Sequence, residues 1–139
     1  MLNTKKSATR RFFLLCLLCL PVLVSAQNCP SSHYDESVTI KHVHDGDTVK
    51  LVDGRKIRLI GINAPEVAKD GQAAEAYAIQ ARDSLRALLG SHGNRARLIH
   101  GQEAKDHYNR SLAHLFLPDG TNLQAQLLSS GLVNKISIP

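Results

Sequence analysis

The sequence predicts one mainly β domain with two helices, which places it in the α+β class. Five short runs rich in β-branched residues are separated by Gly, Asp and Pro turns, and only two segments show the helical spacing of apolar residues. The first helix follows the third strand and the second ends the domain, so helices do not alternate with strands as they do around a parallel sheet. This order favours a small five-stranded Greek-key barrel of the OB type.

Residues 1–26 are predicted to be an export signal that takes no part in the fold. Four basic residues precede an apolar run at 12–24, and Val24-Ser25-Ala26 offers a small-residue cleavage site. We expect cleavage after Ala26, which leaves 113 of the 139 residues, enough for a single domain. The apolar run is short for a bilayer span, so we expect a protein in the periplasm or the medium without stable membrane association.

Removal of this signal changes the charge and the cysteine content. It takes four of the 17 basic residues and none of the 12 acidic ones, so the net charge falls from +5 to +1. Nucleic-acid binding would then depend on local charge. Cys29 is the cysteine that remains, either as a spare thiol or in an intermolecular disulfide, and the oligomeric state stays open. We expect Cys29 in a flexible tail, 27–37, before a domain at 38–139.

The first three strands are predicted at 38–44, 48–52 and 56–61. An Asp-Gly turn follows the first, and the other two form a hairpin. A three-residue loop with a bulge at Gly54 gathers the apolar residues on one face, whereas a two-residue loop would mix charged and apolar groups on both. The face predicted to be apolar holds Val49, Leu51, Ile57 and Leu59. Arg58 then lies outside the core, where it is available for a ligand.

The clearest helix is predicted between Gly71 and Gly90, because apolar residues recur there at steps of three and four. The same spacing turns Tyr77 toward the core. Two more strands follow at 95–100 and 111–117, and a short helix at 122–130 ends at a glycine.

Three polar turns carry the chemistry-bearing residues. They are Asp45-Gly46-Asp47-Thr48, Asn63-Ala64-Pro65-Glu66 and Asp106-His107-Tyr108-Asn109-Arg110. Each alone is explained by turn chemistry or solvation. Together with Arg58 they supply hard oxygen ligands for a cation and guanidinium groups for a phosphate, which a phosphodiester hydrolase requires.

The order and spacing of these turns resemble the staphylococcal nuclease (thermonuclease) family. Its Asp-Gly-Asp-Thr turn precedes an Arg-Leu-x-Gly-x-Asp-x-Pro-Glu stretch, matched here by 58–66, and an Asp-x-Tyr-Gly-Arg turn follows a helix, matched by 106–110. The resemblance covers Val38 to about Asn134. It implies an OB-type barrel that hydrolyses DNA and RNA with Ca²⁺.

The same resemblance implies roles for the matched residues. Asp47, the side chain of Asn63 and the backbone carbonyl of Ala64 would coordinate Ca²⁺, with Asp45 as a supporting acid. In the catalytic set, Glu66 would orient or deprotonate the attacking water, and two arginines would hold the phosphate. These arginines are Arg58 and Arg110.

Three departures from the family pattern bear on these roles. Asn63 replaces an aspartate, so a neutral oxygen takes the place of an anionic ligand and should weaken Ca²⁺ binding. Asn109 replaces a glycine, and asparagine tolerates the positive φ of such a turn. The chain stops at Pro139 without the family's final helix, which leaves either a marginally stable domain or one that depends on an oligomer.

Two other functions compete with the enzyme. A non-catalytic OB module with a degraded metal site would bind oligonucleotides, but it has little need for Glu66. A zinc or copper site is suggested by His42 and His44 on one strand face, although no third ligand joins them at a diagnostic spacing. Tyr108 and three lysines are further candidates for holding a strand, although exposed lysines usually indicate only solvation. These lysines are Lys50, Lys69 and Lys105.

Overall fold

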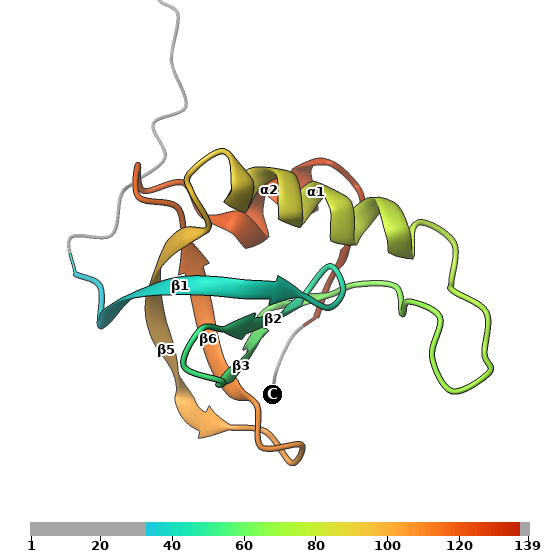
Figure 1. Ribbon diagram of the computed structural model, residues 1–139, viewed down its shortest axis with the longest axis horizontal. Helices are drawn as coiled ribbons and strands as arrows, with labels where there is room; N and C mark the ends of the chain where they lie inside the picture. Colours follow the sequence, from blue (N-terminus) through green and yellow to red (C-terminus); the bar gives the residue numbers. More distant parts are fainter. Residues whose placement is uncertain (1–32, 137–139) are drawn as a thin grey trace, which may run out of the picture.

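The computed structural model describes residues 33–136, so the predicted signal, Cys29 and residues 137–139 lie outside it. Five strands close a barrel in the order β1-β2-β3-β6-β5, with two helices over one side of it (Figure 1). The strands are β1 (Glu36–Val43), β2 (Thr48–Leu51), β3 (Lys56–Leu59), β5 (Arg95–Lys105) and β6 (Ser111–Phe116). The predicted fold class is confirmed. Neither helix of this part of the chain is long and apolar enough to cross a bilayer.

Strand β1 begins two residues before Val38, inside the segment predicted to be a flexible tail. Glu36 pairs with Leu98 of β5, and the ring of Tyr34 packs edge-on against Phe116 with 5.3 Å between centroids. Polar composition suggested a tail, but these long-range contacts tie its described part, residues 33–37, to the barrel.

The β2–β3 hairpin has the predicted register. Val49 pairs with Ile57, and the N–H of Leu51 donates to the carbonyl of Arg55 at 2.8 Å, which leaves a three-residue loop at 52–54. Gly54 has a φ of 94°, as a bulge at this position requires. The apolar face of the hairpin lies in the core.

The barrel is closed by parallel pairing of β3 with β6, in which Arg58 is the partner of Leu112. Strand β5 pairs with β6 in antiparallel fashion and runs on to Lys105, five residues beyond the predicted end at His100. The register shifts between His100 and Lys105, so the end of β5 bends away from the regular ladder.

Helix α1 (Ala78–Gly90) is shorter than predicted, because the chain from Gly71 to Tyr77 is not helical. The backbone of Tyr77 is in the left-handed region, with a φ of 67°, and its side chain is 65% exposed. The prediction that Tyr77 faces the core was therefore wrong. Positive φ values at Asp70 and Gly71 also interrupt any helix there. Figure 1 shows this segment as a loop that projects beyond the start of α1.

Helix α2 (Leu123–Ser129) confirms the short predicted helix. The side chain of Asn122 caps it by accepting the N–H of Ala125 at 2.9 Å, and Gly131 follows with a φ of 70°. Beyond it, β7 (Asn134–Lys135) pairs with β4 (Ile62–Asn63), which the sequence did not predict because two-residue strands show no periodicity.

Candidate active site

The carboxylate of Asp47 lies at the centre of the candidate site, at the end of the turn that leads into β2. Its Oδ2 accepts the backbone N–H of Ala64 at 2.7 Å, and its Oδ1 accepts the hydroxyl of Thr48 at 2.9 Å. Oδ1 of Asp45 accepts the backbone N–H of Asp47 at 2.9 Å and so holds the turn. Two of the predicted acidic turns therefore meet at one carboxylate.

Gly46 allows this turn to pack closely against the rest of the site. A Cβ at this position would lie 2.7 Å from the Cβ atoms of both Ala64 and Ala81, the latter on α1. Real Cβ atoms do not approach so closely, so the turn reaches its position because residue 46 has no side chain.

Burial raises the pKa of Asp47 to about 6, and the nearby charge of Asp45 acts in the same direction. The hydrogen bond from Ala64 and the charge of Arg58 oppose that rise without cancelling it. The carboxylate of Asp47 is thus a buried anion that a further cation would stabilise.

The guanidinium of Arg58 joins two of the predicted metal ligands. Its Nη2 lies 3.2 Å from Oδ2 of Asp47 and 3.1 Å from Oδ1 of Asn63, and its Nη1 donates to the carbonyl of Leu59 at 2.6 Å. Pairing with Thr48 across β2 sets the position of Arg58. The oxygens of Asp47 and Asn63 therefore converge on one positively charged atom.

These oxygens fit a Ca²⁺ site in kind, because calcium takes carboxylate, amide and backbone carbonyl oxygens. Within residues 33–136, however, no group of three or more His, Cys, Asp or Glu side chains is arranged to hold a metal ion. A calcium site here would depend on the amide oxygen of Asn63 and the carbonyl of Ala64 besides Asp47. Its anionic charge would be low.

Arg110 reaches the same region from the turn before β6. Asp106 holds it through Oδ1, which accepts the backbone N–H of Arg110 at 2.9 Å, and through Oδ2, which accepts Nε at 2.7 Å. Nη1 of Arg110 then donates to the hydroxyl of Thr48 at 3.2 Å. The two arginines thus contact neighbouring residues, Arg58 at Asp47 and Arg110 at Thr48.

Asp106 is a functional residue of the site whose role the sequence motif does not predict. Burial acts to raise the pKa of its carboxyl, but the hydrogen bonds and charge of Arg110 outweigh burial and lower that pKa. The four-residue spacing of an acid and an arginine was the signal that could have identified this pair. The turn between them has a φ of 61° at Asn109, as predicted.

Among the described residues, Glu66 makes no hydrogen bond or ion pair with the other predicted catalytic residues. It is exposed in the loop after β4, where its N–H donates to Oε2 of Glu75 at 2.9 Å and its carbonyl accepts the N–H of Glu75 at 2.9 Å. Among the described residues its carboxylate has no hydrogen-bond or ion-pair partner. Glu75 could not be predicted as a partner of Glu66, since long loops carry no periodic pattern.

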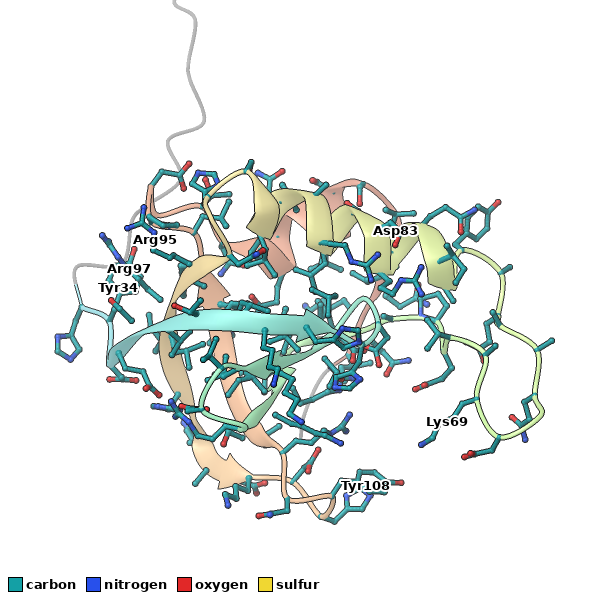
Figure 2. The ribbon with its side chains drawn as sticks, viewed as in Figure 1. Tyr34, Lys69, Asp83, Arg95, Arg97 and Tyr108 are labelled. Atoms are coloured by element: carbon teal, nitrogen blue, oxygen red, sulfur yellow. The ribbon has the colours of Figure 1, made fainter. Side chains whose placement is uncertain are left out.

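The other candidates have ordinary surface positions. Tyr108 is 69% exposed beside Arg110, whose Cζ is 5.3 Å from the ring centroid. Figure 2 shows Tyr108 and Lys69 projecting on the same side of the molecule. Lys105 donates to Oδ1 of Asn109 at 2.7 Å and so supports the turn.

The histidine pair is confirmed as a pair of neighbours. The rings of His42 and His44 meet edge to face with 4.8 Å between centroids, and burial lowers the pKa of His44. No third His, Cys, Asp or Glu in the described part of the chain completes a metal site with them.

Comparison with known proteins matches the chain to one family and to relatives named as nucleases. The family model "Staphylococcal nuclease homologue" matches residues 56–138. The chain is 37% identical over 87 residues to a thermonuclease from Staphylococcus intermedius, which covers 60% of this chain and 51% of that protein. It is 30% identical over 90 residues to a thermonuclease from Staphylococcus hyicus, covering 63% and 52% of the two chains.

A third relative is an uncharacterized endonuclease from Escherichia coli O157:H7, 29% identical over 115 residues, which are 81% of this chain and 69% of that protein. The chain thus spans about half the length of the two thermonucleases and about two thirds of the endonuclease. Because the family model covers more than half of the sequence, the chain belongs to the staphylococcal nuclease family.

Proposed function

We propose that this protein is an exported nuclease that hydrolyses phosphodiester bonds of DNA, RNA or both, with Ca²⁺ as its cofactor. One observation carries the proposal: Arg58 and Arg110, from distant parts of the sequence, contact the adjacent residues Asp47 and Thr48. Its relatives named thermonuclease and endonuclease support this reaction, and the signal-like segment 1–26 supports export.

The cation would be held by Asp47, the amide oxygen of Asn63 and the carbonyl of Ala64, with Asp45 in support. When bound there, Ca²⁺ would offset the negative charge that develops on the phosphoryl group. The raised pKa of Asp47 supports this assignment, since an incompletely compensated buried carboxylate favours a nearby positive charge.

The two arginines would grip the nonbridging phosphate oxygens. In the described structure Nη2 of Arg110 has no protein partner, because Asp106 and Thr48 engage only Nε and Nη1. Arginine suits this position because its planar fork binds two oxygens at once. As negative charge grows during attack, fixed guanidinium groups stabilise the transition state more than the ground state.

Glu66 would place the attacking water and take its proton. The water oxygen forms a bond to phosphorus, the bond from phosphorus to the leaving oxygen breaks, and solvent protonates that oxygen. The products are a phosphomonoester and a free hydroxyl. The exposed carboxylate of Glu66 has no competing protein partner in residues 33–136, so it is available to a water.

The test is hydrolysis of single-stranded DNA and RNA by the purified full chain, with Ca²⁺ or with a chelator. We expect cleavage only with Ca²⁺ and a rate about 100-fold lower for Glu66→Gln, as for loss of a general base. Glu103→Gln, which changes another exposed glutamate, on β5, is the matched control and should leave the rate unchanged. If the wild-type chain cuts no faster than Glu66→Gln in any condition, a non-catalytic oligonucleotide-binding module becomes the better description.

A further inference from the structure

We propose a second phosphate-binding site on the outer face of β1 and β5, centred on Arg95 and Arg97, that takes the backbone of a nucleic-acid strand. The identity of this ligand rests on the proposed function. The site extends that function, because it would bind a second part of the substrate strand at a distance from the residues that cut it.

The two arginines lie on one face of β5. Ala96 and Leu98 between and after them are buried in the barrel, so Arg95 and Arg97 face outward. On β1, Thr39 pairs with Arg95 and Ser37 pairs with Arg97, which sets a hydroxyl residue opposite each guanidinium. Hydroxyl and guanidinium groups are both good donors to phosphate oxygens.

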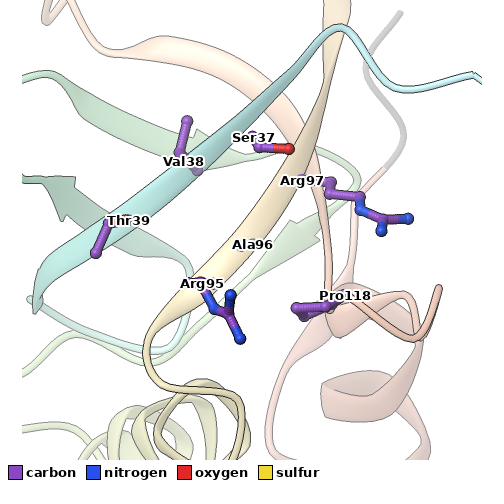
Figure 3. Close-up of a pocket in the computed structure, with 7 residues that line it drawn as sticks. All are labelled: Ser37, Val38, Thr39, Arg95, Ala96, Arg97 and Pro118. Atoms are coloured by element: carbon purple, nitrogen blue, oxygen red, sulfur yellow. The ribbon is translucent and has the colours of Figure 1, made fainter.

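These residues line a hollow of about 260 Å³. Figure 3 shows Arg95 and Arg97 on β5, Ser37 and Thr39 on β1, and Pro118 at the border of the hollow. No acidic side chain is among the residues that line it. The described lining of the hollow therefore carries two positive charges and no negative one, which suits an anion.

The arginines of this hollow differ from the others in their pairing. Of the seven arginines in residues 33–136, five have a carboxylate oxygen within 4.0 Å, and Arg95 and Arg97 are the two that have none. Two like charges on the same face of a strand repel each other. An external anion would relieve that repulsion, whereas no group in the described structure does so.

Tyr34 holds Arg97 in place without using its N–H groups. The guanidinium Cζ lies 5.0 Å from the ring centroid of Tyr34, and this ring in turn packs against Phe116. A cation–π contact leaves all the donors of the guanidinium available to a ligand. Because the arginine covers the ring, the tyrosine is less suited to stacking on a base, so we expect contact with the backbone and no sequence preference.

The proposed site is separate from the candidate active site. Figure 2 shows Tyr34, Arg95 and Arg97 on the opposite side of the molecule from Lys69 and Tyr108. A long strand that follows the barrel wall would reach both sites, whereas a dinucleotide would reach one. Two linked contacts raise the apparent affinity for the long strand only.

The experiment compares two double variants of the full chain that lose the same charge. Arg95→Ala with Arg97→Ala removes the unpaired arginines, and Arg82→Ala with Arg86→Ala removes two that pair with Asp83 on α1. Binding of a labelled single strand of about 16 nucleotides, the upper site size of one OB fold, is measured by fluorescence anisotropy in chelator across a salt series.

We expect the first variant to bind about tenfold more weakly and its slope of log K against log salt to fall by about 1.4, the value for two phosphate contacts on a single strand. The control should match the wild type. Equal binding by both variants, or equal loss, would overturn the site. Arg95→Gln with Arg97→Gln keeps the apolar stems over Tyr34 and repeats the test if the alanine variant melts early.

Two further measurements separate the possible failures. Cleavage of a dinucleotide should be unchanged in the first variant, while KM for the long strand rises. Loss of binding in that variant together with no cleavage by the wild type would refute the proposed function and leave this site standing. Inorganic phosphate should displace the strand from the wild type better than chloride of equal ionic strength does, and equal displacement by the two anions would refute a phosphate site.

Discussion

The guanidinium of Arg58 lies 3.2 Å from the carboxylate of Asp47, and the two side chains are only 12% and 7% exposed. A cation bound at Asp47 would thus share its oxygens with a positive charge that the protein already supplies. The balance among Arg58, the ligand at 63 and Ca²⁺ should decide how well the site works.

Asn63→Asp should tighten Ca²⁺ binding by about tenfold, or about 1.4 kcal/mol. The change replaces a neutral amide oxygen, 3.1 Å from Nη2 of Arg58, by a carboxylate and so adds one anionic ligand. Calorimetry on the pure protein measures the affinity. Asn134→Asp, which adds the same charge on the paired strand β7, is the control, and unchanged or weaker affinity in Asn63→Asp would contradict the placement of the ligands.

Arg58→Lys should lower kcat about 100-fold, as loss of a transition-state hydrogen-bond donor does. Lysine keeps the charge but cannot contact Asp47, Asn63 and the Leu59 carbonyl together as the guanidinium does. Single-turnover kinetics on DNA measure the rate. Arg55→Lys, at the far end of the same hairpin, should change it little, and similar losses in both variants would show that only hairpin stability had changed.

Asp106→Asn should lower stability by about 2 kcal/mol at neutral pH, because hydrogen bonds to charged groups contribute that much. The lowered pKa of Asp106 means that its ionised form stabilises the folded state above the usual aspartate range. This stabilisation is lost as the pH falls through the lowered pKa, so the difference between variant and wild type should shrink in acid. Denaturant titrations at neutral and acidic pH measure it, and a difference that does not depend on pH would mean that the charge plays no part.

Gly46→Ala should destabilise the fold by about 1–3 kcal/mol, the usual cost of overpacking. The new Cβ would meet two other Cβ atoms at 2.7 Å, and these belong to Ala64 and Ala81, which cannot rotate away. Gly90→Ala is the control, since nothing lies within 4 Å of a Cβ there. Thermal unfolding of both variants tests this, and equal midpoints would show that the turn has room to move.

Much of the barrel could be predicted because apolar and polar residues alternate along its strands. The face that holds Val49 and Ile57 allowed only one hairpin loop, and the structure has that loop. The predicted start of α1 was wrong because apolar spacing continues through Tyr77, while positive φ values at Asp70 and Tyr77 delay the start of the helix to Ala78. The spacing of apolar residues indicates which side chains could share a face, but it does not indicate where the backbone adopts a positive φ.

The sequence named candidate residues for the site, but it did not predict the contacts between them. The motifs identified Asp47, Asn63 and both arginines, but nothing local in the sequence joins Arg110 to Thr48. That contact depends on long-range strand pairing, which periodicity does not encode. That the carboxylate of Glu66 has no partner among the described residues was also not predicted, because the hydrogen bonds of its backbone to Glu75 join residues nine apart in a loop without periodic pattern.

The parallel pairing of β3 with β6 has a consequence for folding. Arg58 lies on β3, and Arg110 immediately precedes β6, so the two arginines come together at Asp47 and Thr48 only when these strands join. A collapsed chain that has formed its hairpins but has not paired β3 with β6 would keep the two arginines apart. During refolding, the return of nucleic-acid cleavage should therefore report on the pairing of β3 with β6. It should lag behind the recovery of the circular dichroism signal of the helices.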